Sequence, residues 1–305
     1  MDTDAYKKEA FDYNEAFSRN LGLISEQEQL VLKNKCVAIA GCGGVGSAHA
    51  HTLARLGIGR FHLADPDDYS IANFNRQFAA NMKTIDRNKA EVTAEMIYSI
   101  NPEAQVEISK EKVDRDNADD FVSGSDIVID GVDFFSISGR RNLFRAARNK
   151  GTPALTAAPL GFSGTLHVFT IEGMSFDDYF DLDDSQEYAE QIIRFLIGLA
   201  PSALHSGYLD LRMVDPVTGR GPSSIIGVQL AASLVGAEVV RILLHRGSSR
   251  IAPAYFQFDA YRQSIRKRHL RHGNRNWLQR VKRIIATHML SKLGLLDALR
   301  QVAHE

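Results

Sequence analysis

The stretch VAIAGCGGVGS, residues 37–47, decides the fold that this sequence predicts. Its first four residues form a short apolar run that is typical of a buried strand. Gly41, Gly43 and Gly46 then match the G-x-G-x-x-G pattern, and Gly44 lies in the same turn. In this pattern a strand turns tightly into a helix, whose N-terminus and backbone N–H groups meet a phosphate group. The stretch predicts a nucleotide-binding α/β fold, and a mononucleotide or a dinucleotide fits equally well.

A second strand with an acidic end supports this prediction. The segment FHLAD, residues 61–65, follows the predicted helix from about Ser47 to Leu56. Asp65 comes 24 residues after Gly41, near the spacing at which an acidic side chain accepts hydrogen bonds from a ribose. Asp65 is therefore a candidate ribose-binding residue.

The cations that follow favour ATP over NAD. Asn73, Arg76 and Gln77 come directly after the acidic loop, and Lys89 lies on a helix expected over residues 83–99. A triphosphate carries more negative charge than a pyrophosphate bridge, so a site that adenylates needs fixed cations to stabilise the leaving pyrophosphate. Arg76 and Lys89 can supply these cations, although each on its own also fits a solvated surface residue.

A carboxylate at the end of another strand completes the set of candidate nucleotide-binding residues. The segment SDIVIDGVD, residues 125–133, predicts a strand that ends at Asp133, at the edge where parallel sheets place ligand-binding groups. A carboxylate at this edge suits Mg²⁺ that bridges phosphate groups. The alternative is that Asp133 caps the next helix.

With these residues the sequence resembles the ThiF, MoeB and HesA type adenylyltransferases, whose fold ubiquitin-activating enzymes share. The resemblance is clear over about residues 15–175 and continues more faintly to about 260. It is carried by GCGGVGS, DPDDYSIANFNRQ, INPEAQVE and IDGVD. The resemblance implies that Asp65 holds the ribose, that Asn73, Arg76, Gln77 and Lys89 contact phosphates, and that Asp133 binds Mg²⁺. It also implies a homodimer in which Arg19 reaches the nucleotide of the opposite subunit.

The sequence departs from that family in two respects. Phe134 stands where members commonly have an asparagine after the magnesium aspartate. The chain has only two cysteines, Cys36 and Cys42, and neither has metal-ligand spacing. We therefore expect no structural zinc and no thioester on this chain, so that an acyl adenylate would pass to a separate nucleophile or collapse within the site.

Composition fits a soluble globular protein of the cytoplasm. At 305 residues, with 44% hydrophobic and 24% charged residues, the chain can form a full α/β core. Its formal net charge of −1 gives no overall attraction to nucleic acid or membrane. We expect no signal peptide and no membrane-spanning stretch. Two cysteines in a chain of this length are compatible with a reducing compartment.

We predict three regions. They are an N-terminal helical arm (1–30), an ATP-binding adenylation domain (31–262) and a basic amphipathic helical tail (263–305). Within the domain we expect a doubly wound, Rossmann-like, mostly parallel sheet with antiparallel strands later in the chain. The expected later strands are 164–171 and 255–261, and the further expected helices are 24–33, 136–149 and 224–245.

The sequence leaves the role of three further features open. The acidic stretch 173–190 fits a solvated loop, a second metal site or a surface for a basic partner. His205 fits a structural histidine or a general base. The tail has nine cations and no acidic residue from Arg262 to Arg283. This suits RNA phosphates, a membrane surface, packing in a dimer or a solvated helix.

Three functions follow, and the first is preferred by a small margin. An adenylyltransferase would activate the C-terminal glycine carboxylate of a ubiquitin-like or sulfur-carrier protein and release pyrophosphate. An enzyme that resembles tRNA threonylcarbamoyladenosine dehydratase would act on a modified tRNA base held by the basic tail, without a transfer cysteine. A non-catalytic or NAD-binding Rossmann module would need neither Arg76 nor Lys89.

Overall fold

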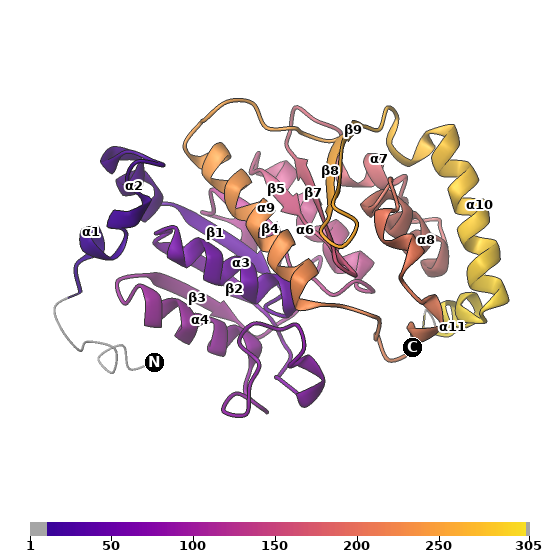
Figure 1. Cartoon of the computed structure of the whole chain (residues 1–305), viewed down its shortest axis with the longest axis horizontal. Helices are drawn as coiled ribbons and strands as arrows, with labels where there is room; N and C mark the ends of the chain where they lie inside the picture. The colour runs from indigo at the N-terminus through magenta and orange to yellow at the C-terminus, as the bar shows by residue number, and fades with distance from the viewer. Residues whose placement is uncertain (1–10, 303–305) are drawn as a thin grey trace.

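A single mixed sheet forms the centre of the protein, of which a computed structural model describes residues 11–302 (Figure 1). Along the chain the strands are β1 Cys36–Ala40, β2 Arg60–Ala64, β3 Gln105–Ser109, β4 Ile127–Asp130, β5 Ala154–Thr156, β6 Pro159–Leu160, β7 Ser163–Phe169, β8 Ala254–Asp259 and β9 Ser264–His269. Their order across the sheet is β3-β2-β1-β4-β5-β7-β8-β9, with β6 paired to β7. The strands β1 to β5 are parallel, and β7, β8 and β9 are antiparallel. The predicted doubly wound α/β sheet is thus confirmed.

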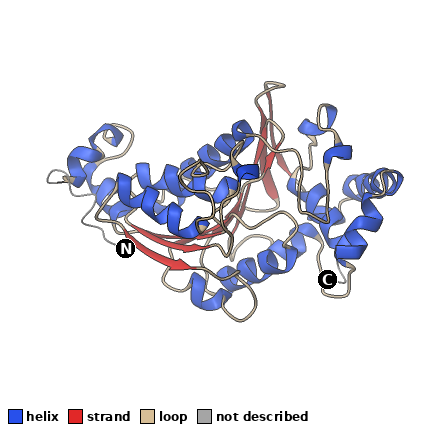
Figure 2. Cartoon of the chain, turned by 90° about the horizontal axis from the view of Figure 1, so that it is seen from below, coloured by secondary structure: helices blue, strands red, loops and turns tan. Residues whose placement is uncertain are grey.

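Helices cover both faces of the sheet (Figure 2). They are α1 Tyr13–Ala16, α2 Glu26–Lys33, α3 Gly44–Arg55, α4 Lys89–Ile100, α5 Ala118–Val122, α6 Ile137–Asn149, α7 Phe176–Phe180, α8 Tyr188–Leu199, α9 Ile225–Leu243, α10 Trp277–Lys292 and α11 Leu295–Val302. Alternate residues of β1 face opposite layers: Val37 and Ile39 pack with α3, α4 and α9, whereas Ala38 and Ala40 pack with α5, α6, α7 and α8. Two apolar layers therefore flank one sheet, as the period of two along a strand requires.

Several predicted boundaries differ from the observed ones. The helix expected from residue 83 begins at Lys89, because the side chain of Asn88 accepts hydrogen bonds from the N–H groups of Ala90 and Glu91 and caps it there. The strand expected to reach Asp133 ends at Asp130, since the chain turns at Gly131 against the glycine loop.

The ends of the predicted central domain also fall inside structural elements. The boundary at residue 30 lies within α2, and the boundary at 262 lies in the hairpin between β8 and β9. The basic tail is therefore not wholly helical, because its residues 264–269 form the edge strand β9. Residues 1–10 and 303–305 of the predicted arm and tail lie outside the described part.

One helix passes a test of length and composition for a membrane span, although the sequence predicts no such stretch. By length and composition α9 is apolar enough, with a hydropathy of 1.7. In the fold, however, α9 packs between α3 and β7 as a helix of the core. Such core helices pass the same test of length and composition, so this property is weak support for a membrane span.

Candidate active site

Three glycines bring the loops after β1 and β4 into contact. Gly41 has a positive φ of 89°. A Cβ atom added to Gly46 would lie 1.7 Å from the carbonyl oxygen of Gly41, and one added to Gly131 would lie 2.4 Å from the same oxygen. Because no side chain fits at these distances, the close packing of helix, turn and neighbouring loop requires glycine at these positions.

The next two glycines open the start of α3. Gly43 is the N-cap residue and makes no side-chain capping bond, and Gly44 is the first helical residue. A Cβ atom at Gly44 would meet its nearest neighbour, Val228, at 3.5 Å, which is an ordinary contact. The first N–H groups of α3 have no partner within the helix and face the carboxyl edge of the sheet. This helix start is suited to bind a phosphate group.

Asp65 fixes the glycine loop in place. It follows β2 and is buried. Its Oδ2 accepts a hydrogen bond from the N–H of Cys42 at 2.6 Å, and its Oδ1 accepts one from the N–H of Asp67 at 2.9 Å. Burial raises the pKa of this carboxyl group, and the two hydrogen bonds oppose that shift. The structure thus places Asp65 beside the loop, where the sequence predicts the ribose.

Lys89 reaches the same place from the first turn of α4. Its Nζ atom lies 2.9 Å from Oδ2 of Asp67. The lysine side chain is 9% exposed, whereas the aspartate side chain is 63% exposed. A nearly buried cation is thus held next to the glycine loop by a solvated carboxylate. Asp67 is a site residue that the sequence analysis missed, although it stands in the DPDD motif.

The segment after Asp67 packs directly on the glycine loop. A Cβ atom at Gly43 would lie 3.6 Å from Nε2 of Gln77, and one at Gly44 would lie 3.9 Å from Cγ of Arg76. Gln77 is buried, and its Oε1 has no hydrogen-bond partner among the described residues. Asn73 instead orders the loop itself, since its Oδ1 accepts a hydrogen bond from the N–H of Ser70 at 2.9 Å.

Arg76 and Asp133 lie close enough for their charges to interact. Burial lowers the pKa of Arg76, and the carboxylate of Asp133 opposes this shift. Asp133 is exposed in the loop after β4, where its Oδ1 accepts a hydrogen bond from the N–H of Phe135 at 2.9 Å. A lone carboxylate beside a phosphate site fits Mg²⁺, which takes its other ligands from phosphates and water. Among residues 11–302, no cluster of three or more histidine, cysteine or acidic side chains could hold a metal ion.

Arg140 holds the loop that carries Asp133. Its guanidinium group is buried on α6, and Nε lies 2.7 Å from Oδ2 of the buried Asp130. The same group donates hydrogen bonds to the carbonyl oxygens of Val132, Asp133 and Phe134. Arg140 is not predictable from the sequence, because nothing in the spacing shows which arginine of α6 faces the sheet.

Arg19 lies away from the glycine loop of its own chain. It is exposed in the turn Ser18–Asn20, next to α1. The neighbouring Asn20 donates a hydrogen bond to the carbonyl oxygen of Leu56, at the C-terminal end of α3. Because the glycine loop lies at the other end of α3, about 18 Å away, the structure does not bring Arg19 to the site within one chain.

The acidic stretch 173–190 is mostly held by arginines. It forms α7 and the start of α8, and the loop 181–187 between them exposes Asp183, Asp184 and Glu187. Asp177 pairs with Arg141 and Arg145, and Asp181 pairs with Arg194 and Arg275. These ion pairs give most of the acidic side chains a structural role.

Three further side chains are buried. Burial lowers the pKa of His205 to about 4, which keeps the ring neutral near pH 7. Burial raises the pKa of Cys36 to about 11 and raises the pKa of Cys42 still further, so neither thiol is a ready nucleophile.

Comparisons with known proteins agree with this architecture. The sulfur carrier protein ThiS adenylyltransferase of Escherichia coli (strain K12) is 33% identical over 156 residues, which cover 50% of this chain and 61% of the relative. The tRNA threonylcarbamoyladenosine dehydratase of Bacillus subtilis (strain 168) is 37% identical over 142 residues, which cover 46% of this chain and 55% of the relative. The chain thus spans less than two thirds of the length of these relatives.

Solved structures share the fold. The crystal structure of PaaA has a TM-score of 0.65 at 19% identity and covers 86% of this chain and 84% of its own. The Escherichia coli dehydratase TcdA in complex with ATP has a TM-score of 0.57 at 22% identity and covers 76% of this chain and 95% of its own. The sequence pattern of the ThiF family matches residues 17–279, which is most of the chain. This chain therefore belongs to the ThiF family.

Proposed function

We propose that this protein is an ATP-dependent adenylyltransferase that activates a carboxylate. A carboxylate oxygen attacks the α-phosphorus of ATP, the bond to the β-phosphate breaks, and pyrophosphate leaves. The observation that carries this proposal is that two cations lie beside the glycine loop, because a nicotinamide dinucleotide needs neither. Arg76 packs at Gly44, and Lys89 lies near enough to Asp65 for their charges to interact. The relative from Escherichia coli, a ThiS adenylyltransferase by name, supports the same reaction.

Each site residue has a role in this proposal. The N–H groups of Gly44 and its neighbours, together with Arg76 and Lys89, stabilise the charge that develops on the leaving pyrophosphate. Asp65 accepts hydrogen bonds from the ribose, and Asn73 and Gln77 contact phosphate oxygens. When bound at Asp133, Mg²⁺ would neutralise part of the phosphate charge.

The preferred substrate is the C-terminal carboxylate of a ubiquitin-like or sulfur-carrier protein. The ThiS adenylyltransferase among the relatives supports this choice. Since Cys36 and Cys42 are buried thiols with raised pKa values, the acyl group would pass to a nucleophile outside this chain.

A second candidate is a dehydratase that acts on threonylcarbamoyladenosine in tRNA. The Bacillus subtilis relative and the shared fold of TcdA support it, and so does the run of exposed cations on β9. Such an enzyme would cyclise the activated carboxylate in place, so it would need no cysteine.

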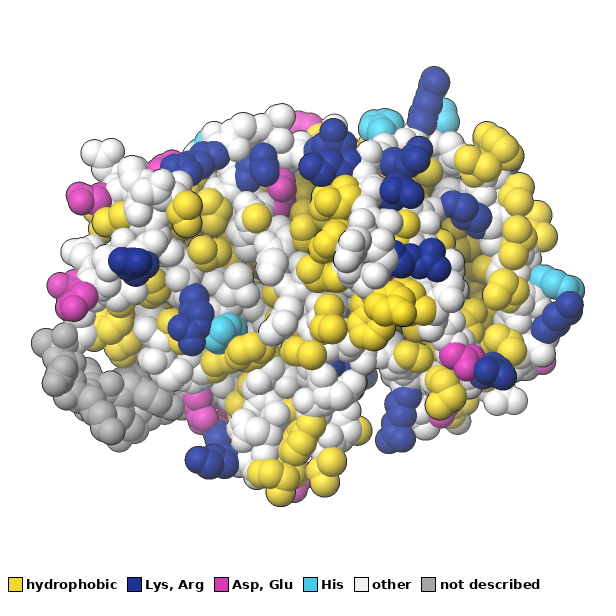
Figure 3. Space-filling model, in the orientation of Figure 1, with side chains coloured by type: hydrophobic (Ala, Val, Ile, Leu, Met, Phe, Trp, Pro, Cys, Tyr) yellow, Lys and Arg dark blue, Asp and Glu magenta, His cyan; other side chains and the backbone are white. Residues whose placement is uncertain are grey.

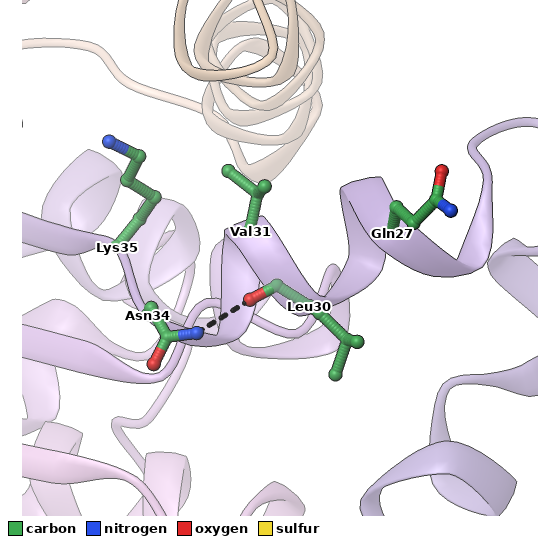
Figure 4. Close-up of a pocket in the computed structure, with 5 residues that line it drawn as sticks. All are labelled: Gln27, Leu30, Val31, Asn34 and Lys35. Carbon is green, nitrogen blue, oxygen red and sulfur yellow. Dashed lines mark hydrogen bonds between the residues drawn. The ribbon is translucent and has the colours of Figure 1, made fainter.

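We further propose a homodimer in which Arg19 completes the site of the opposite subunit. Two exposed apolar patches support this arrangement. The arm carries Leu21, Leu23, Leu30 and Val31, and the loop beside the glycine turn carries Ile71, Phe74, Phe78 and Met82. Leu30 and Val31 border a hollow on α2 (Figure 4), and hydrophobic side chains gather on the loop that projects beyond α4 (Figure 3).

Mixing inactive Arg19→Ala and Asp133→Ala subunits should restore part of the activity, whereas no rescue would contradict a shared site.

The proposed location is the cytoplasm. Its support is that both cysteines of the chain are buried and unpaired, which is ordinary in a reducing compartment.

Exchange of labelled pyrophosphate into ATP tests the reaction. With the correct carboxylate present, drawn from small glycine-ended proteins or bulk tRNA, the purified protein should catalyse the exchange. Lys89→Ala and Asp133→Ala should abolish it without unfolding the chain, while the exposed controls Lys83→Ala and Asp119→Ala should keep it. If the two site variants exchange as fast as the controls, the assignment of the site is wrong.

A further inference from the structure

The inner side of α10 carries both polar and apolar side chains: Leu290 is buried beside Ile193 of α8, and Ala286 packs against the same cluster. Gln279 is 2% exposed and donates hydrogen bonds to the carbonyl oxygen of Ile197 and to Oδ1 of Asn274, both at 3.2 Å. Lys282 donates a hydrogen bond to the carbonyl oxygen of Pro201, and Arg283 lies 3.6 Å from Asp181. An ordinary surface helix turns its apolar side inward and exposes a polar side, whereas α10 packs inward through this mixed set.

The apolar side of α10 faces outward. Its large exposed side chains are Trp277 (68%), Leu278 (48%), Val281 (45%), Ile284 (70%), Ile285 (54%) and Met289 (47%). At about 100° per residue, these six positions share an arc of roughly 140° of the helix. We call this set the outer face of α10. Soluble proteins rarely expose so many large apolar side chains together without a binding partner.

Cations border the outer face. Arg280 and Lys292 are exposed on α10, and Arg266, Lys267 and Arg268 are exposed on β9. Arg268 lies near enough to Lys282 for their like charges to interact. The sequence has no acidic residue from Arg262 to Leu296. An apolar face bordered by these cations is complementary to a surface that is apolar inside and anionic outside.

A lipid bilayer with anionic headgroups has both properties. A second copy of this chain would bring two cationic rims together, and RNA has phosphates but no apolar surface that could bury isoleucine side chains. The outer face also lies at the end of the molecule opposite α1 and α2, where a flat surface can approach it (Figure 1), and hydrophobic side chains run along it (Figure 3).

We propose that α10 binds the surface of an anionic membrane, with its outer face in the boundary between headgroups and acyl chains and the cations at the lipid phosphates. This attachment is peripheral and does not depend on the reaction proposed above. It would place the adenylation site next to a membrane.

Flotation with vesicles tests the proposal on the full chain. The protein should bind vesicles made of equal amounts of phosphatidylcholine and phosphatidylglycerol, and bind vesicles of phosphatidylcholine alone much more weakly. Trp277 is the only tryptophan of the sequence, so its emission should shift to the blue when the outer face enters the lipid.

The double variant Ile284→Glu/Ile285→Glu should weaken binding at least about tenfold. Ile171→Glu, an equally exposed position on another surface, is the matched control and should bind like the natural protein.

Other results would overturn the proposal. It fails if Trp277 emission is unchanged by anionic vesicles, or if the Ile284/Ile285 variant floats as well as the control. A blue shift that grows with protein concentration in the absence of lipid would assign the outer face to a second copy. Binding to bulk tRNA together with no binding to vesicles would assign the cations to RNA.

Discussion

Gly46 lies so close to the carbonyl oxygen of Gly41 that the start of α3 has no room for a methyl group. Gly46→Ala should therefore destabilise the fold by at least about 1–3 kcal/mol, as overpacking does, and remove nucleotide binding with it. Gly44→Ala is the matched control, because its methyl group would meet only ordinary contacts and it should fold normally. Urea unfolding of both variants gives the comparison. Equal stability of the two would show that the contact at Gly41 is not tight.

Single residues of the site were predicted to different extents. Asp65, Arg76, Gln77 and Lys89 are marked by their distance from the glycine turn, and the structure gathers all four around it. The roles assigned to them stay predictions. Asp67 was missed because the sequence does not show which acidic residue of the loop pairs with the lysine.

At the scale of elements, Arg140 and Asp130 join α6 to β4 and hold the Asp133 loop. Arg140→Gln should cost about 3–5 kcal/mol, because it leaves the buried carboxylate of Asp130 without its counterion. Arg145→Gln should cost less than about 1 kcal/mol, since Arg145 is 45% exposed in its ion pairs with Asp177 and Asp184. The free energies of unfolding in urea measure both. A small loss for Arg140→Gln would mean that the pair does not hold the loop.

Helices and strands whose own sequence has an apolar pattern can be predicted. Elements that form or orient only through contacts with another part of the fold cannot. The glycine turn and the apolar spacing of α6 and α9 mark their ranges closely. Strand β9 reads SIRKRH and has no apolar alternation. It forms because its backbone pairs with β8 from Ser264 to His269, which composition does not reveal. The outward direction of the apolar side of α10 was equally hidden, since it depends on polar contacts with α8.

At the scale of the whole molecule, buried histidines make the stability of the fold fall at acid pH. Burial lowers the pKa of His49 and His167 to about 3 and that of His205 to about 4. In the unfolded chain each has a pKa of about 6.5 and takes up a proton more readily. Their contribution to the free energy of unfolding is thus complete above about pH 6.5. It is lost as the pH falls from about 6.5 toward about 4 for His205 and toward about 3 for His49 and His167, at up to ~1.4 kcal/mol per pH unit for each histidine.

Urea unfolding at about pH 7.5 and about pH 5 measures this loss. His49→Leu should reduce the difference in the free energy of unfolding between the two pH values by roughly 2 kcal/mol. His245→Asn replaces an exposed histidine and should leave the difference unchanged. A natural protein that is equally stable at both pH values would contradict this account.

The residues around the start of α3 are proposed to bind three phosphates and not a nicotinamide dinucleotide. Calorimetric titration of the full chain with ATP and Mg²⁺, and separately with NAD, tests it most directly. The account predicts that ATP binds, that NAD binds far more weakly, and that Arg76→Ala and Lys89→Ala remove the preference. Tighter binding of NAD, unaffected by either substitution, would contradict it.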